Sequence, residues 1–131
     1  MWVYPEIRTL GEFISYWARH DPERAVLRDA TRTITYGEMD RLINRAAHWL
    51  LDHGAVEDRL IGYFGKNSFD FYIAFYGCGH TRSGLAIFNW RLAAPELAQQ
   101  IRDSETGLII AERELEPLLN EALGLLENPP K

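Results

Sequence analysis

The sequence has 131 residues, of which 47% are apolar and 12% aromatic, and its formal charge is −5. Domains usually contain about 100–150 residues, so this length predicts a single unit over residues 1–131. The aromatic content and modest net charge exclude a disordered chain. No run of about 18 apolar residues occurs, which excludes a transmembrane helix.

Cysteine content, N-terminal pattern and charge together indicate the compartment and the class of partner. The lone Cys78 cannot form an internal disulfide, which is typical of a reducing compartment. The N-terminus lacks the basic flank and apolar segment of a secretory signal. We therefore expect a cytoplasmic protein. A pI near 5.3 and scattered arginines argue against a nucleic-acid partner.

The first element is predicted to be a helix that begins with a capping box. In such a box Thr9 accepts a hydrogen bond from a free amide, and Glu12 reaches back to the start of the helix. An apolar stripe at helical spacing follows these two residues. Asp21 precedes a proline and so ends the helix.

A hairpin and a long helix are predicted next. Residues 25–28 and 33–35 are short extended runs joined by turn residues, which indicates a β-hairpin. Thr35 and Glu38 form a second capping box that begins an amphipathic helix. Gly54 is placed to close this helix in the left-handed conformation.

From residue 60 onward, short apolar strands alternate with helices. Residues 60–64, 85–88 and 108–111 are continuously apolar, which is typical of parallel strands buried on both faces. The intervening and final helices are predicted at residues 67–80, 95–102 and 113–126. This order predicts an α/β fold with three layers: a mostly parallel, flavodoxin- or Rossmann-like sheet flanked by helices, with the N-terminal helix and hairpin added.

Two glycine-containing segments fail as phosphate-binding motifs. Gly65-Lys66 follows a strand, but a phosphate loop needs glycine where Leu60 stands and Ser or Thr where Asn67 stands, so a loop that caps a helix is predicted. The dinucleotide pattern that starts at Gly77 has Arg82 in place of its third glycine and follows a helix.

Small and aromatic residues mark the helix that contains Gly77 and Gly79. We expect these glycines, with Gly84, to let a buried helix approach the sheet closely. The aromatic side chains of the same helix indicate that it is covered on several sides. The alternative is an aromatic wall that lines a ligand pocket.

Histidine and cysteine show no pattern of a metal or nucleophile site. His20, His48, His53 and His80 lack the spacing of metal ligands, and we expect them at surfaces and helix ends. Cys78 has no basic partner that the sequence identifies. The sequence therefore predicts no metal ligand and no catalytic residue.

Arg91 is the only candidate binding residue. It lies just after a buried strand, where α/β sheets tend to place binding groups, and its guanidinium can bind phosphate or carboxylate through two hydrogen bonds. The alternative is a solvated arginine beside a helix start. Spacing alone favours the alternative.

Several segments in order resemble the start of the AMP-forming acyl-CoA synthetases, the adenylate-forming superfamily. They are Ile34-Thr-Tyr-Gly-Glu-Met-Asp40, Asn44-Arg-Ala-Ala-His-Trp-Leu50, Gly65-Lys-Asn-Ser68, Gly84-Leu-Ala-Ile-Phe-Asn-Trp-Arg-Leu92, Pro95-Glu-Leu97, Ile101-Arg-Asp-Ser104 and Leu108-Ile-Ile110. No single segment is diagnostic. Their order and spacing over roughly residues 9–120 carry the resemblance.

The resemblance implies a parent enzyme that activates a carboxylate with ATP and Mg²⁺ to an acyl-adenylate and passes the acyl group to coenzyme A (CoA). It implies that residues 1–131 are the first part of the large N-terminal domain, without the C-terminal domain. The family's Gly/Ser/Thr-rich phosphate loop is missing, so we expect this chain alone to be inactive and to carry no cofactor. In CoA-forming relatives an arginine at the position of Arg91 lies near the CoA nucleotide.

The resemblance also implies a partner, the remainder of the synthetase. An exposed sheet edge or apolar helix faces would also permit a homodimer, or a stand-alone interaction module that pairs with a synthetase or a complementary chain. A third hypothesis is an independent flavodoxin-like nucleotide binder. The two failed glycine motifs argue against that third hypothesis.

Overall fold

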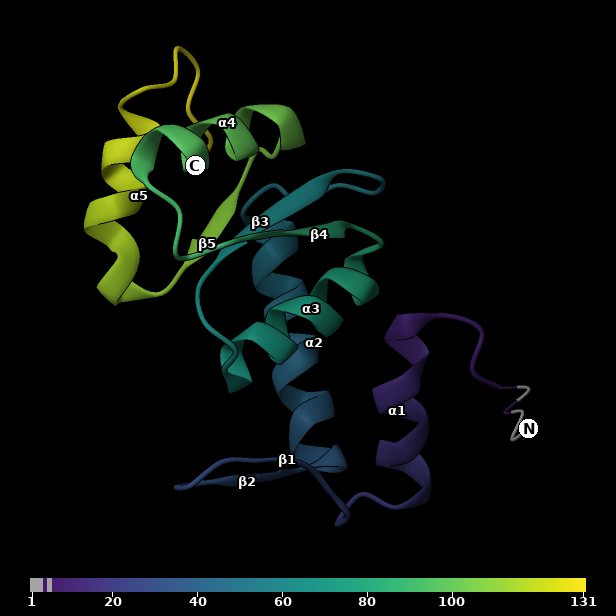
Figure 1. The fold of residues 1–131 in the computed structure, drawn as a ribbon. Helices are drawn as coiled ribbons and strands as arrows, with labels where there is room; N and C mark the ends of the chain where they lie inside the picture. Colours follow the sequence, from purple (N-terminus) through teal and green to yellow (C-terminus); the bar gives the residue numbers. More distant parts are fainter. Residues whose placement is uncertain (1–3, 5) are drawn as a thin grey trace.

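Helices and strands alternate along the chain in the computed structural model, which describes residue 4 and residues 6–131 (Figure 1). In chain order the elements are α1 (Leu10–His20), β1 (Ala25–Arg28), β2 (Thr33–Thr35), α2 (Tyr36–Asp52), β3 (Leu60–Phe64), α3 (Phe69–Thr81), β4 (Gly84–Phe88), α4 (Ala94–Ser104), β5 (Ile109–Ala111), the 3₁₀ turn η1 (Arg113–Leu115) and α5 (Glu116–Leu123). None of the helices in these described ranges has the length and apolar character needed to cross a bilayer.

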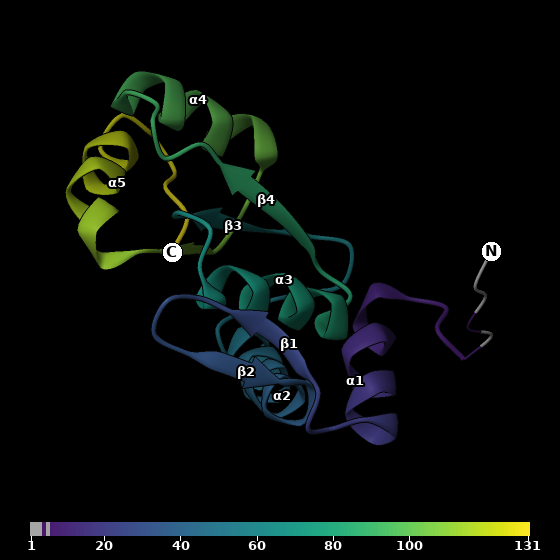
Figure 2. The same cartoon turned by 60° about the horizontal axis from the view of Figure 1, so that its bottom comes forward.

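The central feature is a parallel sheet with the strand order β4-β3-β5. Helices α2 and α3 cover one face of this sheet, and α4 and α5 cover the other (Figure 1, Figure 2). The β1-β2 hairpin is a separate antiparallel pair beside α2. The three-layer α/β fold with an added N-terminal helix and hairpin is therefore confirmed.

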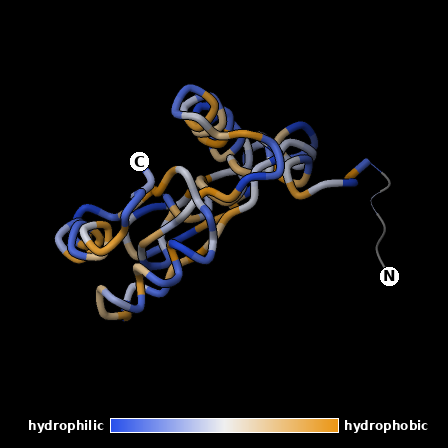
Figure 3. The backbone as a smooth tube through the Cα atoms, turned by 90° about the horizontal axis from the view of Figure 1, so that it is seen from above, coloured by the Kyte–Doolittle hydropathy of each residue, from blue (hydrophilic) through white to orange (hydrophobic). Residues whose placement is uncertain are grey.

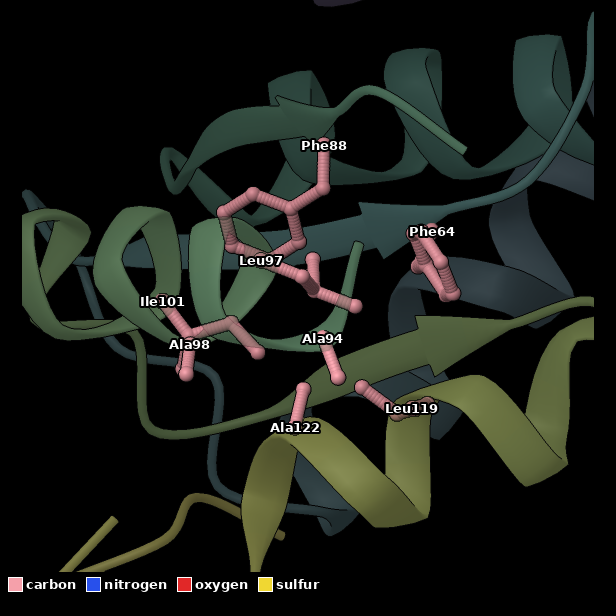
Figure 4. Close-up of a cluster of buried hydrophobic side chains, with 8 residues drawn as sticks. All are labelled: Phe64, Phe88, Ala94, Leu97, Ala98, Ile101, Leu119 and Ala122. Atoms are coloured by element: carbon pink, nitrogen blue, oxygen red, sulfur yellow. The ribbon is translucent and has the colours of Figure 1, made fainter. Parts of the chain in front are cut away.

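Three clusters of buried side chains hold the layers together, and apolar and polar segments alternate along the helices that bury them (Figure 3). The first joins the sheet to α4 and α5 and includes Phe64, Leu97 and Leu119 (Figure 4). The second joins α1, α2 and the hairpin, and the third joins α2 and α3 to the opposite sheet face. Burying one such side chain contributes about 1.5–3 kcal/mol.

Each predicted capping box forms only one of its two halves. At α1 the Glu12 carboxylate accepts hydrogen bonds from the Thr9 and Arg8 amides at 2.9 and 2.8 Å, while the Thr9 hydroxyl makes no capping bond. At α2 the Thr35 hydroxyl accepts from the Glu38 amide at 3.3 Å, and the Glu38 carboxylate instead pairs with Arg32. One half of the box is enough to begin each helix. Gly54 has a φ of +98°, which confirms the predicted left-handed closure of α2.

The expectation that glycines bring α3 close to the sheet is wrong. A Cβ atom on Gly77 would lie 3.3 Å from the Ala46 Cβ in α2, and a Cβ on Gly79 would lie 3.2 Å from the Gly11 nitrogen in α1. These glycines therefore permit close contact between helices. Gly84 lies in β4 beside Leu60.

Two other features differ from the sequence prediction. The last helix is shorter than residues 113–126: the 3₁₀ turn η1 occupies Arg113–Leu115, and α5 begins at Glu116, with Pro117 in its first turn, and ends at Leu123. Burial on both faces holds for β3 after Leu60, but not for β5, which is half-buried, nor for β4, whose Ile87 is 59% exposed. The reason is position: in the described sheet β4 and β5 are the outer strands, and β3 lies between them.

Candidate functional site

The loops after β3, β4 and β5 meet at the carboxyl edge of the sheet, where α/β proteins tend to bind ligands. The loop after β3 contributes Lys66 and Ser68. The loop after β4 contributes Trp90 and Arg91, and the segment after β5 contributes Glu112 and Glu114. We call these residues the carboxyl-edge cluster.

Trp90 is the platform of the carboxyl-edge cluster. The Arg91 guanidinium carbon lies 4.1 Å from the centre of the Trp90 ring, and the Lys66 Nζ lies 5.1 Å from it. Both distances are within the range of cation–π attraction. Trp90 is half-buried against the α4–α5 core, so the ring that holds the two cations is itself fixed by packing.

The loop that carries Arg91 has a defined shape. The side-chain oxygen of Asn89 accepts a hydrogen bond from the Arg91 amide at 3.1 Å, and the Asn89 carbonyl accepts one from the Leu92 amide at 3.2 Å. This is a side-chain-supported turn. It leaves the Arg91 side chain exposed, with its guanidinium available to an anion.

Lys66 also forms an ion pair with Glu114 across the edge. Both side chains are about half exposed, 46% and 57%, so the pair contributes little to stability. Its effect is local: it holds the Lys66 ammonium beside the Trp90 ring.

A hydrogen-bond network lies beneath the exposed cations. The Tyr63 hydroxyl lies 3.2 Å from the Ser68 hydroxyl and donates to the Glu112 carboxylate at 3.4 Å. Ser68 also caps α3 by accepting from the Phe71 amide at 3.2 Å. Burial raises the pKa of the Tyr63 phenol, which keeps it protonated as a donor.

Gly65 has a packing role in this edge. A Cβ atom at Gly65 would lie 2.9 Å from both the Tyr63 ring and the Glu112 side chain. The glycine lets these two residues close over the loop. Packing therefore explains why residue 65 is a glycine, and no phosphate-binding role is needed to explain it.

The other chemically interesting residues are not brought together. His20 and His53 bond to carbonyls of their own helices, and the His80 Nε2 lies 2.8 Å from the Gly11 carbonyl oxygen. Among residues 4 and 6–131 no three His, Cys, Asp or Glu side chains converge to hold a metal ion. Cys78 is 1% exposed and burial raises its pKa to about 11, so it is no nucleophile at neutral pH.

The aromatic side chains of α3 pack on one another, on Tyr63 of β3 and on the cluster between α1, α2 and the hairpin. Phe71 meets the Tyr63 ring edge-on at 5.3 Å and lies parallel to Phe75 at 6.1 Å. Both phenylalanines are half-buried. Helix α3 also packs on α1, α2 and the strands β3 and β4, which matches the prediction of a helix covered on several sides.

Sequence reasoning proposed Arg91 as a site residue and did not propose Trp90, Glu112 or Glu114. The sequence did carry a signal for the two glutamates, because the carboxyl ends of parallel strands all lie at one edge of the sheet. Applying that rule to the strand at residues 108–111 would have placed the two glutamates opposite Lys66.

Comparison with known proteins identifies the family. The profile of the AMP-binding enzymes matches residues 14–130. The fatty acid–[acyl-carrier-protein] ligase ScoC of Streptomyces coeruleorubidus is 34% identical over 118 residues, which are 90% of this chain and 23% of that protein. The indoleacetate–CoA ligase of Aromatoleum aromaticum is 27% identical over 79% of this chain and 20% of its own length.

Solved structures show the same fold. The N-terminal domain of FACL13 from Mycobacterium tuberculosis superposes with a TM-score of 0.87 at 25% identity, over 95% of this chain and 31% of that domain. The benzoate CoA ligase of Burkholderia xenovorans gives 0.85 at 18% identity, over 92% of this chain and 24% of the ligase. The chain spans about a quarter or less of the curated relatives' length. The chain belongs to the AMP-binding enzyme family.

Proposed function

We propose that this chain is the first part of the large N-terminal domain of an AMP-forming carboxylate–CoA ligase. In the proposed reaction a carboxylate oxygen attacks the α-phosphorus of ATP, and the bond to pyrophosphate breaks. The CoA thiol then attacks the acyl carbon and AMP leaves. The family assignment and the names of the ligase relatives support this proposal.

Arg91 is proposed to bind a phosphate of the CoA nucleotide. The observation that carries this role is the stacking of its exposed guanidinium on Trp90 at the carboxyl edge of the sheet. Stacking restrains the guanidinium while its N–H groups stay available, which reduces the entropy lost when an anion binds. Lys66 lies on the same ring, where Glu114 balances its charge.

The proposal also names the acyl acceptor and the class of acid that the enzyme activates. ScoC is named for an acyl carrier protein, whereas the Aromatoleum ligase is named for CoA. We favour CoA, because a nucleotide phosphate suits an arginine held on an indole ring. The acid class is proposed as acyl or aryl, with a role in fatty-acid metabolism in the cytoplasm.

A CoA titration of the 131-residue chain tests the Arg91 role. We expect millimolar CoA to shift the indole N–H resonance of Trp90, and dephospho-CoA to shift it less if the 3′-phosphate is the group bound. Arg91→Ala should weaken CoA binding at least about fivefold, as expected for the loss of one charge-assisted contact. Arg45→Ala, a change at an exposed arginine of α2, is the matched control. Equal binding by the Arg91→Ala chain would remove the proposed role.

A second experiment tests whether residues 1–131 can catalyse adenylation without the rest of the ligase. The described part of the chain holds no cluster of acidic metal ligands, and the sequence has no Gly/Ser/Thr-rich loop ending in Pro-Lys. We therefore expect no ATP–pyrophosphate exchange by the purified chain with any carboxylate of a broad panel. Robust exchange would show that residues 1–131 carry adenylation chemistry by themselves.

A further inference from the structure

A shallow groove on the exposed side of α2 is lined mainly by arginine. It has a volume of about 560 Å³ and is lined by Arg32, which precedes β2, and by Arg41 and Arg45 of α2. Glu38 is the acidic side chain among the described residues that line it, so the groove carries two positive charges in excess. We call it the arginine groove.

The fold brings together arginines that are separate in the sequence. Arg41 and Arg45 are about one turn apart on α2, roughly 6 Å along its axis, so their side chains lie on the same face. The Glu38 carboxylate accepts a hydrogen bond from the Arg32 guanidinium at 2.7 Å, and the Arg32 guanidinium carbon lies 5.6 Å from the centre of the Phe69 ring. These two contacts hold Arg32 beside the arginines of α2.

Arg41 and Arg45 carry the unpaired charges of the arginine groove. Both are exposed, and within the described part of the chain neither forms an ion pair. The nearby Asp40 carboxylate is engaged elsewhere, because it accepts from the Ser15 hydroxyl at 2.6 Å and from the Asn44 amide at 3.2 Å. The two guanidiniums are therefore available to carboxylates, which they can bind through paired hydrogen bonds.

The number and spacing of these charges favour an acidic protein helix. Lipid headgroups are recognised by clusters of about four to eight basic residues, and specific DNA sites by about six to ten phosphate contacts. Two free guanidiniums are too few for either, and the formal charge of −5 repels extended polyanions. Two carboxylates four residues apart on a helix match the separation of Arg41 and Arg45.

Leu42 adds an apolar contact to the arginine groove. It lines the groove beside Arg41 and is half-buried against the cluster that joins α1, α2 and the hairpin. An apolar side chain on the same face of a partner helix can lose water there while the carboxylates pair with the arginines. This combination favours an amphipathic helix over a free dicarboxylate.

We infer that the arginine groove docks an acidic, amphipathic helix of a partner protein. Two carboxylates one helical turn apart pair with Arg41 and Arg45, and an apolar side chain packs on Leu42. The contact is small and charged, so binding is weak and depends on salt. No residue of the carboxyl-edge cluster lines the groove, and the inference does not depend on Arg91 or on the acceptor.

A peptide titration of the 131-residue chain tests the arginine groove. The probe is an alanine-based helical peptide of about 20 residues with glutamate at every fourth position and a leucine on the same face. The Nε–H resonances of Arg41 and Arg45 should shift at low salt. Binding should weaken severalfold when ionic strength rises from about 0.01 to 0.15 M. Absence of a shift at millimolar peptide would overturn the inference.

Two control peptides test the chemistry of the occupant. A peptide with glutamine in place of every glutamate should not bind. A peptide of the same composition, with its glutamates distributed around the helix, should bind at least about fivefold more weakly, because one carboxylate at a time can reach an arginine. Equal binding by the glutamine peptide would overturn the charge pairing, and equal binding by the redistributed peptide would overturn the helical occupant.

Variants of the chain locate the binding surface. Arg41→Ala should weaken binding of the glutamate peptide at least about fivefold, as expected for the loss of one charge-assisted contact. Arg102→Ala is the matched control, since it removes the same charge from an exposed position of α4, on the opposite face of the sheet (Figure 2). Equal weakening by Arg102→Ala would mean that only the overall charge attracts the peptide, and would overturn the inference.

A charge exchange makes the pairing specific. The double variant Arg41→Glu and Arg45→Glu should lose the glutamate peptide and bind a lysine peptide of the same spacing. Both positions are exposed, so the variant should fold. Failure of the lysine peptide to bind the folded double variant would overturn the direct pairing.

Two further measurements distinguish other occupants of the arginine groove. The chain should not sediment with vesicles of equal parts phosphatidylcholine and phosphatidylserine. Sedimentation that Arg41→Ala abolishes would identify a membrane surface and overturn the inference. Without peptide the chain should also stay monomeric as its concentration rises. Self-association that Arg41→Ala abolishes would identify a second copy, whose exposed Glu114 and Glu116 are acidic, and would equally overturn it.

Discussion

Gly79 of α3 and Gly11 of α1 lie in backbone contact, so that a Cβ atom on Gly79 would stand 3.2 Å from the Gly11 nitrogen. The neighbouring His80 Nε2 lies 2.8 Å from the Gly11 carbonyl oxygen. These contacts join two helices that are far apart in the sequence. They fix α1 against the α/β unit that carries the carboxyl-edge cluster.

Gly79→Ala should therefore destabilise the protein, although alanine favours helices. The helical preference contributes about 1 kcal/mol in favour of alanine, while crowding against backbone that cannot rotate away costs about 1–3 kcal/mol. We expect a net loss of about 1 kcal/mol in the free energy of unfolding by urea. Gly124→Ala is the control, since its added Cβ makes only ordinary contacts at 3.4 Å or more and should be neutral or stabilising. A Gly79→Ala chain as stable as the parent would show that α1 is not fixed by this contact.

Leu97→Ala tests the core between the sheet and α4. Leu97 is fully buried beside Phe64 and Phe88 (Figure 4), so truncation leaves a cavity that neighbouring rings cannot fill. The expected loss is about 2–5 kcal/mol in the free energy of unfolding. Leu125→Ala, at a side chain that is 53% exposed, should cost less than about 0.5 kcal/mol. Equal losses would mean that α4 is not packed on the sheet as described.

The buried thiol of Cys78 should lower the free energy of unfolding at alkaline pH. Burial raises the pKa of this thiol to about 11 from its ordinary 9.0, so between these values the unfolded chain has released the proton while the folded chain keeps it. The folded state then binds more protons, and stability falls as the pH rises through this window. Burial also raises the pKa values of Tyr63 and Tyr76, which act in the same direction at higher pH.

The measurement is the free energy of unfolding from pH 8 to pH 11 in the parent and in Cys78→Ala. The variant is expected to be less stable at pH 8, because it leaves a small cavity, and to lose less stability on going to pH 11. Parallel pH curves for the two chains would show that Cys78 does not ionise on unfolding. A thiol reagent should also react slowly with the native parent at pH 8 and rapidly after unfolding.

Local signals predicted most of the fold. The hairpin at residues 25–28 and 33–35 has the predicted bounds. It could be predicted because the residues that determine a turn and its two short strands are close together in the sequence. The helix that Thr35 begins and Gly54 closes depends likewise on neighbours in the sequence. The order of strands and helices then allowed few topologies other than a parallel sheet.

Contacts between distant residues could not be predicted in the same way. Lys66 meets Glu114 across 48 positions and Tyr63 meets Glu112 across 49, and neither pairing leaves a periodic pattern. The exposure of Ile87 depends on which strand becomes an edge, which is a property of the whole sheet. Arg91 was proposed as a binding residue from its position after a strand, which is local information, whereas the approach of Lys66 to the Trp90 ring joins two separate loops.

Gly65→Ala tests whether the carboxyl edge needs its close approach. An added Cβ would stand 2.9 Å from the Tyr63 ring, which is 1% exposed and cannot turn away, and 2.9 Å from the more flexible Glu112 side chain. We expect a loss of about 1–3 kcal/mol in the free energy of unfolding, with a displaced Glu112. The rigid partner is Tyr63, so the cost should depend on its ring.

A double-mutant cycle with Tyr63→Leu separates this clash from other effects of the alanine. Leucine removes the edge of the ring that the new Cβ would meet, and so Gly65→Ala should cost less in the Tyr63→Leu background. The expected coupling is about 0.5–3 kcal/mol, the range for residues in direct contact. Additive losses in the cycle would show that Gly65 is required for a reason other than the Tyr63 ring, and the Glu112 contact would then be the remaining one to remove.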